Sequence, residues 1–298
     1  MINKKKNEAQ EKMKYLRLIT LNIMALVVLM PLSLTIGGVK KAQADLLITP
    51  VRVVMEGRDR SAMITLINNS NKSYTYRMGW KFYRMDETGA YEEIADDDQG
   101  EEATKARMIK DLIRFSPRQV RVEPGGRQRI RLSLRKPSDL AVGEYRAHMA
   151  FERLPEIEAP SSTKVKGKLL EMHMTLAFTI PVMVRHEISS VDAKIENVTT
   201  LLAHSSTQNK PSLQVVIKRF GDQSTYGRMR VLLQQDGKER QVGLLNNVAL
   251  FHEIERRYVK IPLDIDPSRT SGKLRIVYEG DGEYRQKIWD EAIYALGR

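Results

Sequence analysis

The chain has 298 residues, of which 42% are hydrophobic and 29% are charged, a composition typical of a globular protein with a buried core. It excludes wholesale disorder and a multi-span membrane protein, and the absence of cysteine excludes disulfide scaffolds, thiolate zinc sites and thiol nucleophiles. Residues 1–44 hold eight Lys or Arg and two Asp or Glu, so they carry half of the formal net charge of +12. The remaining excess is too small to argue for nucleic acid as a partner.

The first segment has the composition of an export signal. Six basic residues precede a largely apolar run at residues 18–34, which Pro31 and several polar residues interrupt. Ala42-Gln43-Ala44 follows, a small-x-small site suited to signal peptidase. We expect a signal peptide over residues 1–44, a mature chain from Asp45 and a periplasmic location. An uncleaved membrane anchor and a start at Met13 are the alternatives.

From Asp45 onward, short segments alternate with period two, which predicts β-strands. Five large side chains share one face of residues 74–82: Tyr74, Tyr76, Met78, Trp80 and Phe82. Ile130, Leu132 and Leu134 alternate with three arginines and a serine over residues 129–135, after a Glu-Pro-Gly-Gly turn. About seven such strands fit residues 45–185, which predicts an immunoglobulin-like β-sandwich with Trp80 at a position that is often buried.

Residues 86–111 interrupt this pattern, because they are acidic at first and then mixed in charge. The segment is either an inserted loop or a short helix. We expect a solvated excursion from the surface of the sandwich.

Residues 170–180 form a long alternating segment. One face carries six large apolar residues: Leu170, Met172, Met174, Leu176, Phe178 and Ile180. This is long for a small sandwich, whose strands usually run about five or six residues. Methionine suits an adaptable contact surface, although a long core strand would give the same pattern.

The rest of the chain, residues 186–298, predicts a second β-sandwich. Five further strands are expected at residues 191–198, 213–219, 228–233, 258–265 and 274–278, with Asp-Gly turns at Asp236 and Asp281. The last segment is ambiguous, because four residues have helical spacing: Trp289, Ala292, Ile293 and Leu296.

The sequence gives no support for an enzyme. Its five histidines, His148, His173, His186, His204 and His252, lack metal-ligand spacing. It contains neither a glycine-rich phosphate loop nor a nucleophile elbow, and no pair of carboxylates stands out. We therefore predict no catalytic residue, no cofactor, no metal and no small-molecule substrate.

Four segments occur in a specific order in the first domain. They are residues 48–54 (Ile-Thr-Pro-Val-Arg-Val-Val), residues 115–132 (Phe-Ser-Pro through Ile-Arg-Leu), residues 143–155 (Gly-Glu-Tyr-Arg through Arg-Leu-Pro), and the alternating strand that ends at Val184-Arg185. Behind a signal peptide, this order resembles the periplasmic chaperones of chaperone–usher pilus assembly. The resemblance covers residues 45–185, and extends to the second domain only in architecture and position.

The resemblance implies an all-β protein with two immunoglobulin-like β-sandwich domains, residues 45–185 and 186–298, in a boomerang arrangement. It implies a chaperone that caps pilus (fimbrial) subunits by lending them a strand and delivers them to an outer-membrane usher. This mode of strand addition is a known one in chaperone–pilin complexes. The residues that it would lend are Leu170, Met172, Met174, Leu176 and Phe178.

The resemblance also implies two charged sites. Arg52 matches a basic residue that anchors the terminal carboxylate of the subunit, but the second basic residue of that anchor aligns with Pro181 here, so this half is missing. Glu144 and Arg185 match a charged pair that bridges the two domains, and Glu279 is a third candidate for this role.

Two other function classes remain open on sequence alone. A surface-displayed structural subunit or adhesin would also have two sandwiches, although Asp45 leads almost directly into the first strand. An enzyme or a sugar-binding sandwich with its site on loops is the second alternative.

Overall fold

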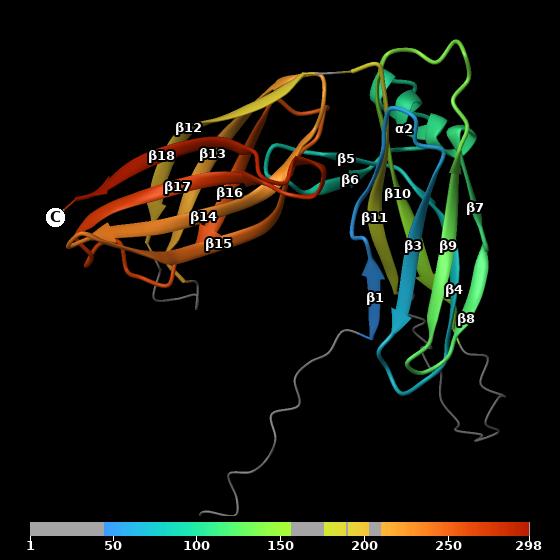
Figure 1. Ribbon diagram of the computed structural model, residues 1–298, viewed down its shortest axis with the longest axis horizontal. Helices are drawn as coiled ribbons and strands as arrows, with labels where there is room; N and C mark the ends of the chain where they lie inside the picture. Colours follow the sequence, from blue (N-terminus) through green and yellow to red (C-terminus); the bar gives the residue numbers. More distant parts are fainter. Residues whose placement is uncertain (1–44, 156–175, 189, 203–209, 298) are drawn as a thin grey trace, which may run out of the picture. The chain divides into compact units, whose positions relative to one another are not determined.

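The computed structural model describes residues 45–155, 176–188, 190–202 and 210–297 (Figure 1). The predicted signal peptide lies outside these ranges, and so do Leu170, Met172 and Met174. Within them the regular elements are β-strands apart from one α-helix and one short 3-10 turn, which confirms the all-β class. No helix in the described ranges reaches the length and hydropathy that a membrane span requires.

The first half of the described chain forms two antiparallel-rich sheets that pack face to face. One sheet has the order β1 (Leu46–Thr49), β3 (Ser61–Asn68), β9 (Arg127–Leu134), β7 (Ile113–Ser116). The other has the order β2 (Val53–Met55), β11 (Ala177–His186), β10 (Gly143–Arg153), β4 (Tyr74–Lys81), β8 (Gln119–Val122). Alternate residues of both sheets meet in one apolar core, which includes Leu66, Tyr76, Ile130 and Phe151.

The predicted face of residues 74–82 is found on β4. Tyr74, Tyr76 and Met78 are buried, while Trp80 is partly buried against the same core. The Trp80 ring meets Phe115 of β7 edge to face, with ring centroids 5.7 Å apart. The expectation that Trp80 is buried in the sandwich is therefore confirmed in part.

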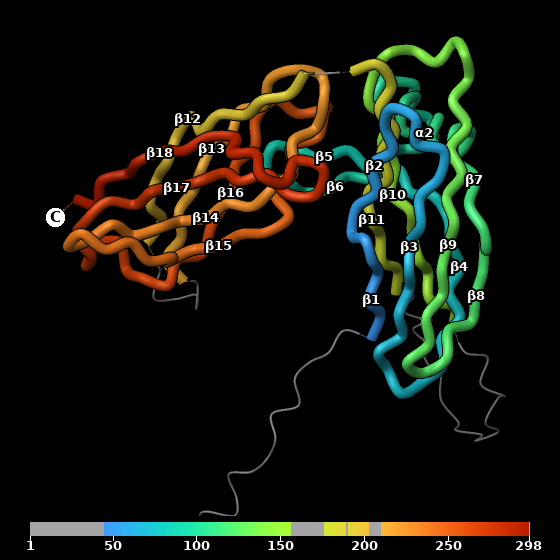
Figure 2. The backbone as a smooth tube through the Cα atoms, viewed as in Figure 1, coloured from blue at the N-terminus to red at the C-terminus, as the bar shows by residue number. Residues whose placement is uncertain are grey.

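The chain changes sheets between its first two strands (Figure 2). β1 pairs antiparallel with β3, and β2 then pairs parallel with β11 at Val53–Val182 through Met55–Val184. This register covers only the last part of β11. The outer edge of β11 at residues 177–181 has no strand partner among the described residues.

Residues 86–111 include a helix, which was one of the two alternatives, whereas the expected solvated excursion is wrong. They contain part of a small hairpin, β5 (Tyr83–Met85) and β6 (Tyr91–Glu93), and most of an α-helix, α2 (Glu101–Leu112). One stripe of α2 is buried: Ala103, Ala106, Ile109 and Leu112. Ile109 and Leu112 belong to the sandwich core, so the helix covers that core and is not a solvated excursion.

The second half of the described chain forms another pair of sheets. One has the order β12 (Val191–Leu201), β13 (Ser212–Gly221), β16 (Arg256–Pro262), and the other has the order β15 (Lys238–Leu250), β14 (Thr225–Gln235), β17 (Gly272–Gly280), β18 (Ile288–Leu296). Their facing sides share a second core, which includes Val215, Val231 and Ile276. The five predicted strands are all present, while β15 and β18 are additional.

The last segment is a strand and not a helix. β18 pairs with β17 along almost its whole length, from Leu296–Gly272 to Ile288–Glu279. Trp289 and Leu296 are buried, whereas Ile293 is 58% exposed. The helical spacing therefore misleads here, because the strand pairing and not the local pattern decides which side chains are covered.

Candidate functional site

Strand β10 is buried on both of its faces. Tyr145, Ala147, Met149 and Phe151 point into the first core. The other face carries three polar residues that are almost fully covered: Glu144, Arg146 and His148, which are 1%, 4% and 2% exposed. Burying ionisable groups is costly unless they are paired, so the partners of these three side chains define the candidate site.

Glu144 is paired with Arg185, the residue directly opposite it on β11. Arg185 Nε donates to Glu144 Oε2 at 2.9 Å. The Ser224 N–H also donates to Glu144 Oε2 at 3.2 Å, and the Ser224 hydroxyl donates to Glu144 Oε1. Burial would raise the pKa of Glu144, but His252, Arg185 and Ser224 hold it well below its usual range.

The other donors of Arg185 reach two more carboxylates. Nη1 donates to Glu56 and Nη2 donates to Glu283, each at 3.1 Å. Burial lowers the pKa of Arg185, and Glu144 and its other neighbours more than offset this and raise it. The structure thus brings together Glu144 and Arg185, and adds Ser224 and Glu283 from the second half of the chain.

Glu279 does not join this pair. Its carboxylate lies 2.8 Å from Arg228 Nε and 3.0 Å from Arg230 Nη1, both on the neighbouring strand β14. The prediction for Glu279 is corrected accordingly. Glu283, four residues later in the 3-10 turn η1 (Gly282–Tyr284), occupies the place expected for it.

Arg52 lies in the short segment between β1 and β2 and is 9% exposed. Its Nη2 donates to Glu283 Oε1 at 2.7 Å, and the guanidinium carbon lies 4.6 Å from the centre of the Tyr226 ring. Nε and Nη1 have no hydrogen-bond partner among the described residues. Arg52 lines a pocket of about 330 Å³ together with Val51, Tyr226 and Glu283.

Arg146 and His148 are covered by the β5–β6 hairpin and by the loop after β15. Arg146 Nη2 pairs with Glu253 and donates to the Tyr83 carbonyl at 2.9 Å. The His148 ring lies against Tyr83 and Tyr91, with ring centroids 5.2 and 4.9 Å apart. Burial and the nearby Arg146 charge lower the pKa of His148 to about 3.

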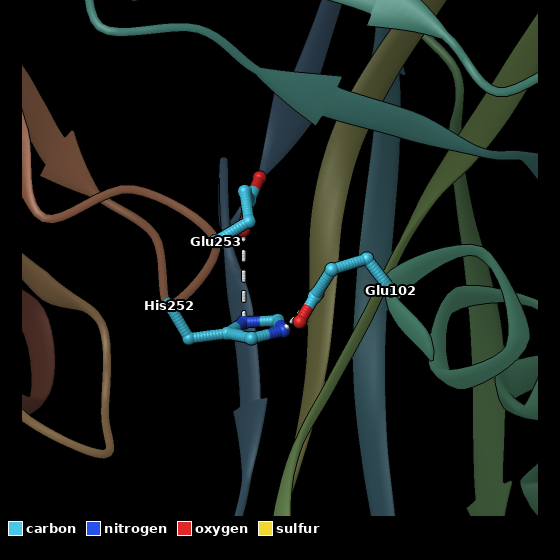
Figure 3. Close-up of side chains that lie close together, drawn as sticks. All are labelled: Glu102, His252 and Glu253. Atoms are coloured by element: carbon cyan, nitrogen blue, oxygen red, sulfur yellow. Dashed lines mark ion pairs between the residues drawn. The ribbon is translucent and has the colours of Figure 1, made fainter. Parts of the chain in front are cut away.

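Next to this face, Glu102 of α2 meets two residues of the loop between β15 and β16, His252 and Glu253 (Figure 3). His252 Nε2 lies 2.6 Å from Glu102 Oε2, and His252 Nδ1 lies 3.6 Å from Glu253 Oε2. Burial lowers the pKa of His252, but the surrounding carboxylates more than offset this and raise it to about 9.

The predicted client-binding strand is described only at its end. Leu176 is 47% exposed, and Phe178 is partly buried against the first core. Ile180, Val182 and Val184 continue this face and are buried in that core. From Phe178 onward, the even-numbered side chains of β11 therefore pack into the core of their own sandwich. Leu176, which precedes them, lies outside that core.

Sequence reasoning missed Ser224, Glu283 and the group of Glu102, His252 and Glu253. Each belongs to a loop or a helix far along the chain from its partner, so no fixed spacing signals the contact. The alternation Glu144, Arg146, His148 resembles a solvated strand face, although these residues are buried.

No protein-family model and no curated protein sequence matches the chain. Among solved structures, it is similar to the Pseudomonas aeruginosa CupB2 chaperone, at 14% identity and a TM-score of 0.40, covering 84% of this chain and 100% of that one. The E. coli chaperone DraB matches at 13% identity and a TM-score of 0.40, covering 85% of this chain and 96% of that one.

A third similar structure is the CsuC–CsuE chaperone–tip adhesion subunit pre-assembly complex from the archaic chaperone–usher Csu pili of Acinetobacter baumannii. It matches at 15% identity and a TM-score of 0.38, covering 84% of this chain and 98% of that one. At these identities and scores the similarities do not assign a function.

Proposed function

We propose that the protein is a periplasmic chaperone of the chaperone–usher type, exported by a cleavable signal peptide. It caps pilus subunits by lending them a strand and delivers them to an outer-membrane usher. Residues 45–185 form the domain that lends the strand, and residues 186–298 form the second domain. The motifs in residues 48–54, 115–132 and 143–155 support this assignment.

The observation that carries the proposal is the open edge of β11. Residues 177–181 pair with β10 on one side only, within the described part of the chain. An unpaired edge offers a row of backbone N–H and C=O groups to another strand. Strand addition uses such an edge for affinity and alternate side chains for specificity.

The apolar alternation in the sequence continues past the point where the sandwich core ends. Leu176 is the first even-numbered residue of this face that its own sandwich leaves half exposed. Leu170, Met172 and Met174 precede it at the same period. Each such side chain contributes about 1.5–3 kcal/mol when a subunit groove buries it fully.

Arg52 is the proposed anchor for a client carboxylate. Its Nε and Nη1 have no hydrogen-bond partner among the described residues, the residue lines a pocket, and a guanidinium forms strong charge-assisted hydrogen bonds to a carboxylate. Glu283 already occupies the third nitrogen, so the client group would share the arginine with it. This sharing gives the anchor a different composition from one built with a second basic residue at Pro181.

The test is client capture by variants of the lent strand. The tagged chain is produced in a periplasm together with a pilus subunit that is encoded beside an usher gene in the same genome. Leu176→Ser and Met174→Ser should each reduce recovery of the complex about tenfold or more, since a lost apolar anchor weakens binding by at least 1.4 kcal/mol. The melting temperature of the free chain should change little.

Thr179→Ser is the matched control, because Thr179 is exposed and lies on the opposite face of β11. It should leave both capture and melting temperature unchanged. Full capture by both apolar-to-serine variants would exclude this strand as the donor. Equal loss of stability and capture would instead identify residues 174 and 176 as ordinary core residues.

A further inference from the structure

Three potential metal-ligating side chains meet in one place although their positions in the sequence give no hint of it. Glu102 comes from the first turn of α2, and His252 and Glu253 come from the loop between β15 and β16 (Figure 3). Each offers a donor atom, and these atoms all lie within 4.8 Å of one another. A single ion can therefore contact all three after small side-chain movements.

The ring nitrogens of His252 contact carboxylates without well-aligned hydrogen bonds. Glu102 Oε2 lies 2.6 Å from Nε2 and forms an ion pair with the protonated ring. Nδ1 has no hydrogen-bond partner among the described residues. Two ligand atoms of one tetrahedral Zn²⁺ lie about 3.3 Å apart, so Glu102 Oε2 has to move away from Nε2 for both to bind the ion.

Glu253 provides independent support for a ligand. Its side chain is only 7% exposed, and its Oε2 has no hydrogen-bond partner in the described part of the chain. Its other oxygen is held by Arg146 and by the Met85 N–H, the latter at 3.0 Å. The carboxylate is thus fixed with one buried oxygen directed at the His252 ring, which is a costly arrangement unless something occupies the space.

The space beside these groups suits one small ion. A cavity of about 10 Å³ is lined by Glu102, His252 and Glu253 together with two arginines, Arg146 and Arg84, of which Arg84 is paired with Asp98. This is close to the smallest space that holds one water molecule. It can accept one bare ion, but not an organic ligand.

The charges around the cavity also suit a cation. Three carboxylates, Glu102, Glu144 and Glu253, surround His252, while two guanidiniums, Arg146 and Arg185, pair with Glu253 and Glu144. These two pairs leave one carboxylate over, so the group keeps one negative charge, and a divalent cation bound there would more than offset it.

We propose that Glu102, His252 and Glu253 form a Zn²⁺ site, with water at the fourth position. One imidazole and two carboxylates match the nitrogen and oxygen ligands that Zn²⁺ accepts. Arg146 and the Met85 N–H orient Glu253 as outer-shell partners. The ion would join helix α2 to the β15–β16 loop, which are elements of different sandwiches. The inference does not depend on the proposed chaperone function.

The test uses the full mature chain without a polyhistidine tag, stripped with a chelator and then titrated with Zn²⁺ against a chromophoric chelator. We expect one equivalent to bind. His252→Gln and Glu102→Gln should each weaken this binding at least tenfold. Melting temperature should rise with Zn²⁺ in the wild type and not in these two variants.

Glu101→Gln is the matched control, because Glu101 is the neighbouring helix residue, with a side chain 79% exposed. It should bind Zn²⁺ as the wild type does. Circular dichroism establishes that each variant is folded, and Glu102, whose side chain is 40% exposed, is the substitution least prone to unfold the chain. Absence of stoichiometric Zn²⁺ binding, or equal binding by all four proteins, would overturn the proposal and leave His252 as a protonated partner of the carboxylates.

Discussion

Arg52 combines burial with unsatisfied hydrogen-bonding capacity. Its side chain is 6% exposed, yet only one of its three nitrogens has a partner within the described ranges. A buried donor without a partner typically costs about 1–3 kcal/mol. We therefore propose that a client carboxylate supplies the missing partner and that the anchor depends on Arg52.

Arg52→Ala should therefore weaken client capture while the chain stays folded. Truncating one side of a buried charged hydrogen bond costs about 2–5 kcal/mol, which is roughly 30-fold or more in affinity. The fold should tolerate the change because Glu283 keeps its contact with Arg185. Pull-down of a co-produced subunit and thermal melts measure the two effects. Capture at the wild-type level would show that Arg52 is not the anchor.

His148 should make stability depend on pH. Its ring is buried against Tyr83 and Tyr91, and Arg146 Nη1 lies 3.4 Å from Nδ1, so the native state holds a neutral imidazole with a pKa of about 3. The unfolded chain takes up a proton below about pH 6.5, and the native state does not. The free energy of unfolding should thus fall as the pH drops below this value.

Urea denaturation at pH 7 and pH 5 measures this contribution. His148→Phe keeps an aromatic ring between the tyrosines but cannot take up a proton. Between these two pH values the wild type should lose about 2 kcal/mol more stability than the variant does. Equal losses in the two proteins would mean that His148 is protonated in the native state.

At the scale of single elements, α2 belongs to the sandwich. Its buried positions recur every third residue, Ala103, Ala106, Ile109 and Leu112, which places them along one side of the helix. Ala103 and Ala106 pack with Ile94 and Phe82, and the other two enter the main core. The helix also supplies Glu102 to the His252 group, so its packing positions a side chain of the proposed metal site.

Ile109→Ala should accordingly destabilise the protein by about 2–5 kcal/mol, the usual cost of emptying a buried aliphatic position. Ile109 is fully buried in the first core. Lys110→Ala, at the neighbouring exposed position, should change the free energy of unfolding by about 0.5 kcal/mol or less. Denaturant titration of both variants makes the comparison. Two equally small effects would mean that the packing of α2 contributes little to the stability of the first core.

At the scale of the whole described unit, residues from both halves of the chain share one buried charged group. Glu144 and Arg185 come from the first sandwich, while Ser224 and Glu283 come from the second half of the chain. An apolar cluster accompanies them, with Met85 and Met183 packed against Tyr226 and Phe251. We propose that this group orients the two domains, as the resemblance implies for Glu144 and Arg185.

Glu144→Ala should destabilise the protein by about 3 kcal/mol or more, because it leaves the Arg185 guanidinium buried without its nearest carboxylate. Glu152→Ala removes an exposed partner of Arg77 and should cost less than about 1 kcal/mol. Calorimetry on both variants separates the two cases. A similar small effect for Glu144→Ala would show that Glu56 and Glu283 alone satisfy Arg185.

The sequence by itself determined the all-β class, because period-two alternation is a local property of each segment. It can be recognised wherever one face of a strand is buried and the other is exposed. The strands around residues 74–82, 129–135 and 213–219 follow from this pattern. The pairing of Glu144 with Arg185 was also expected, but on the basis of family resemblance.

Only the tertiary structure decided which polar residues are covered and which distant segments meet. The charged face of β10 has the pattern of a solvated face, and it is buried because a hairpin and a loop pack onto it. β18 has helical spacing but becomes a strand because β17 offers it an edge. Glu102 and His252 share no local signal, since their meeting depends on how helix α2 and the β15–β16 loop pack together.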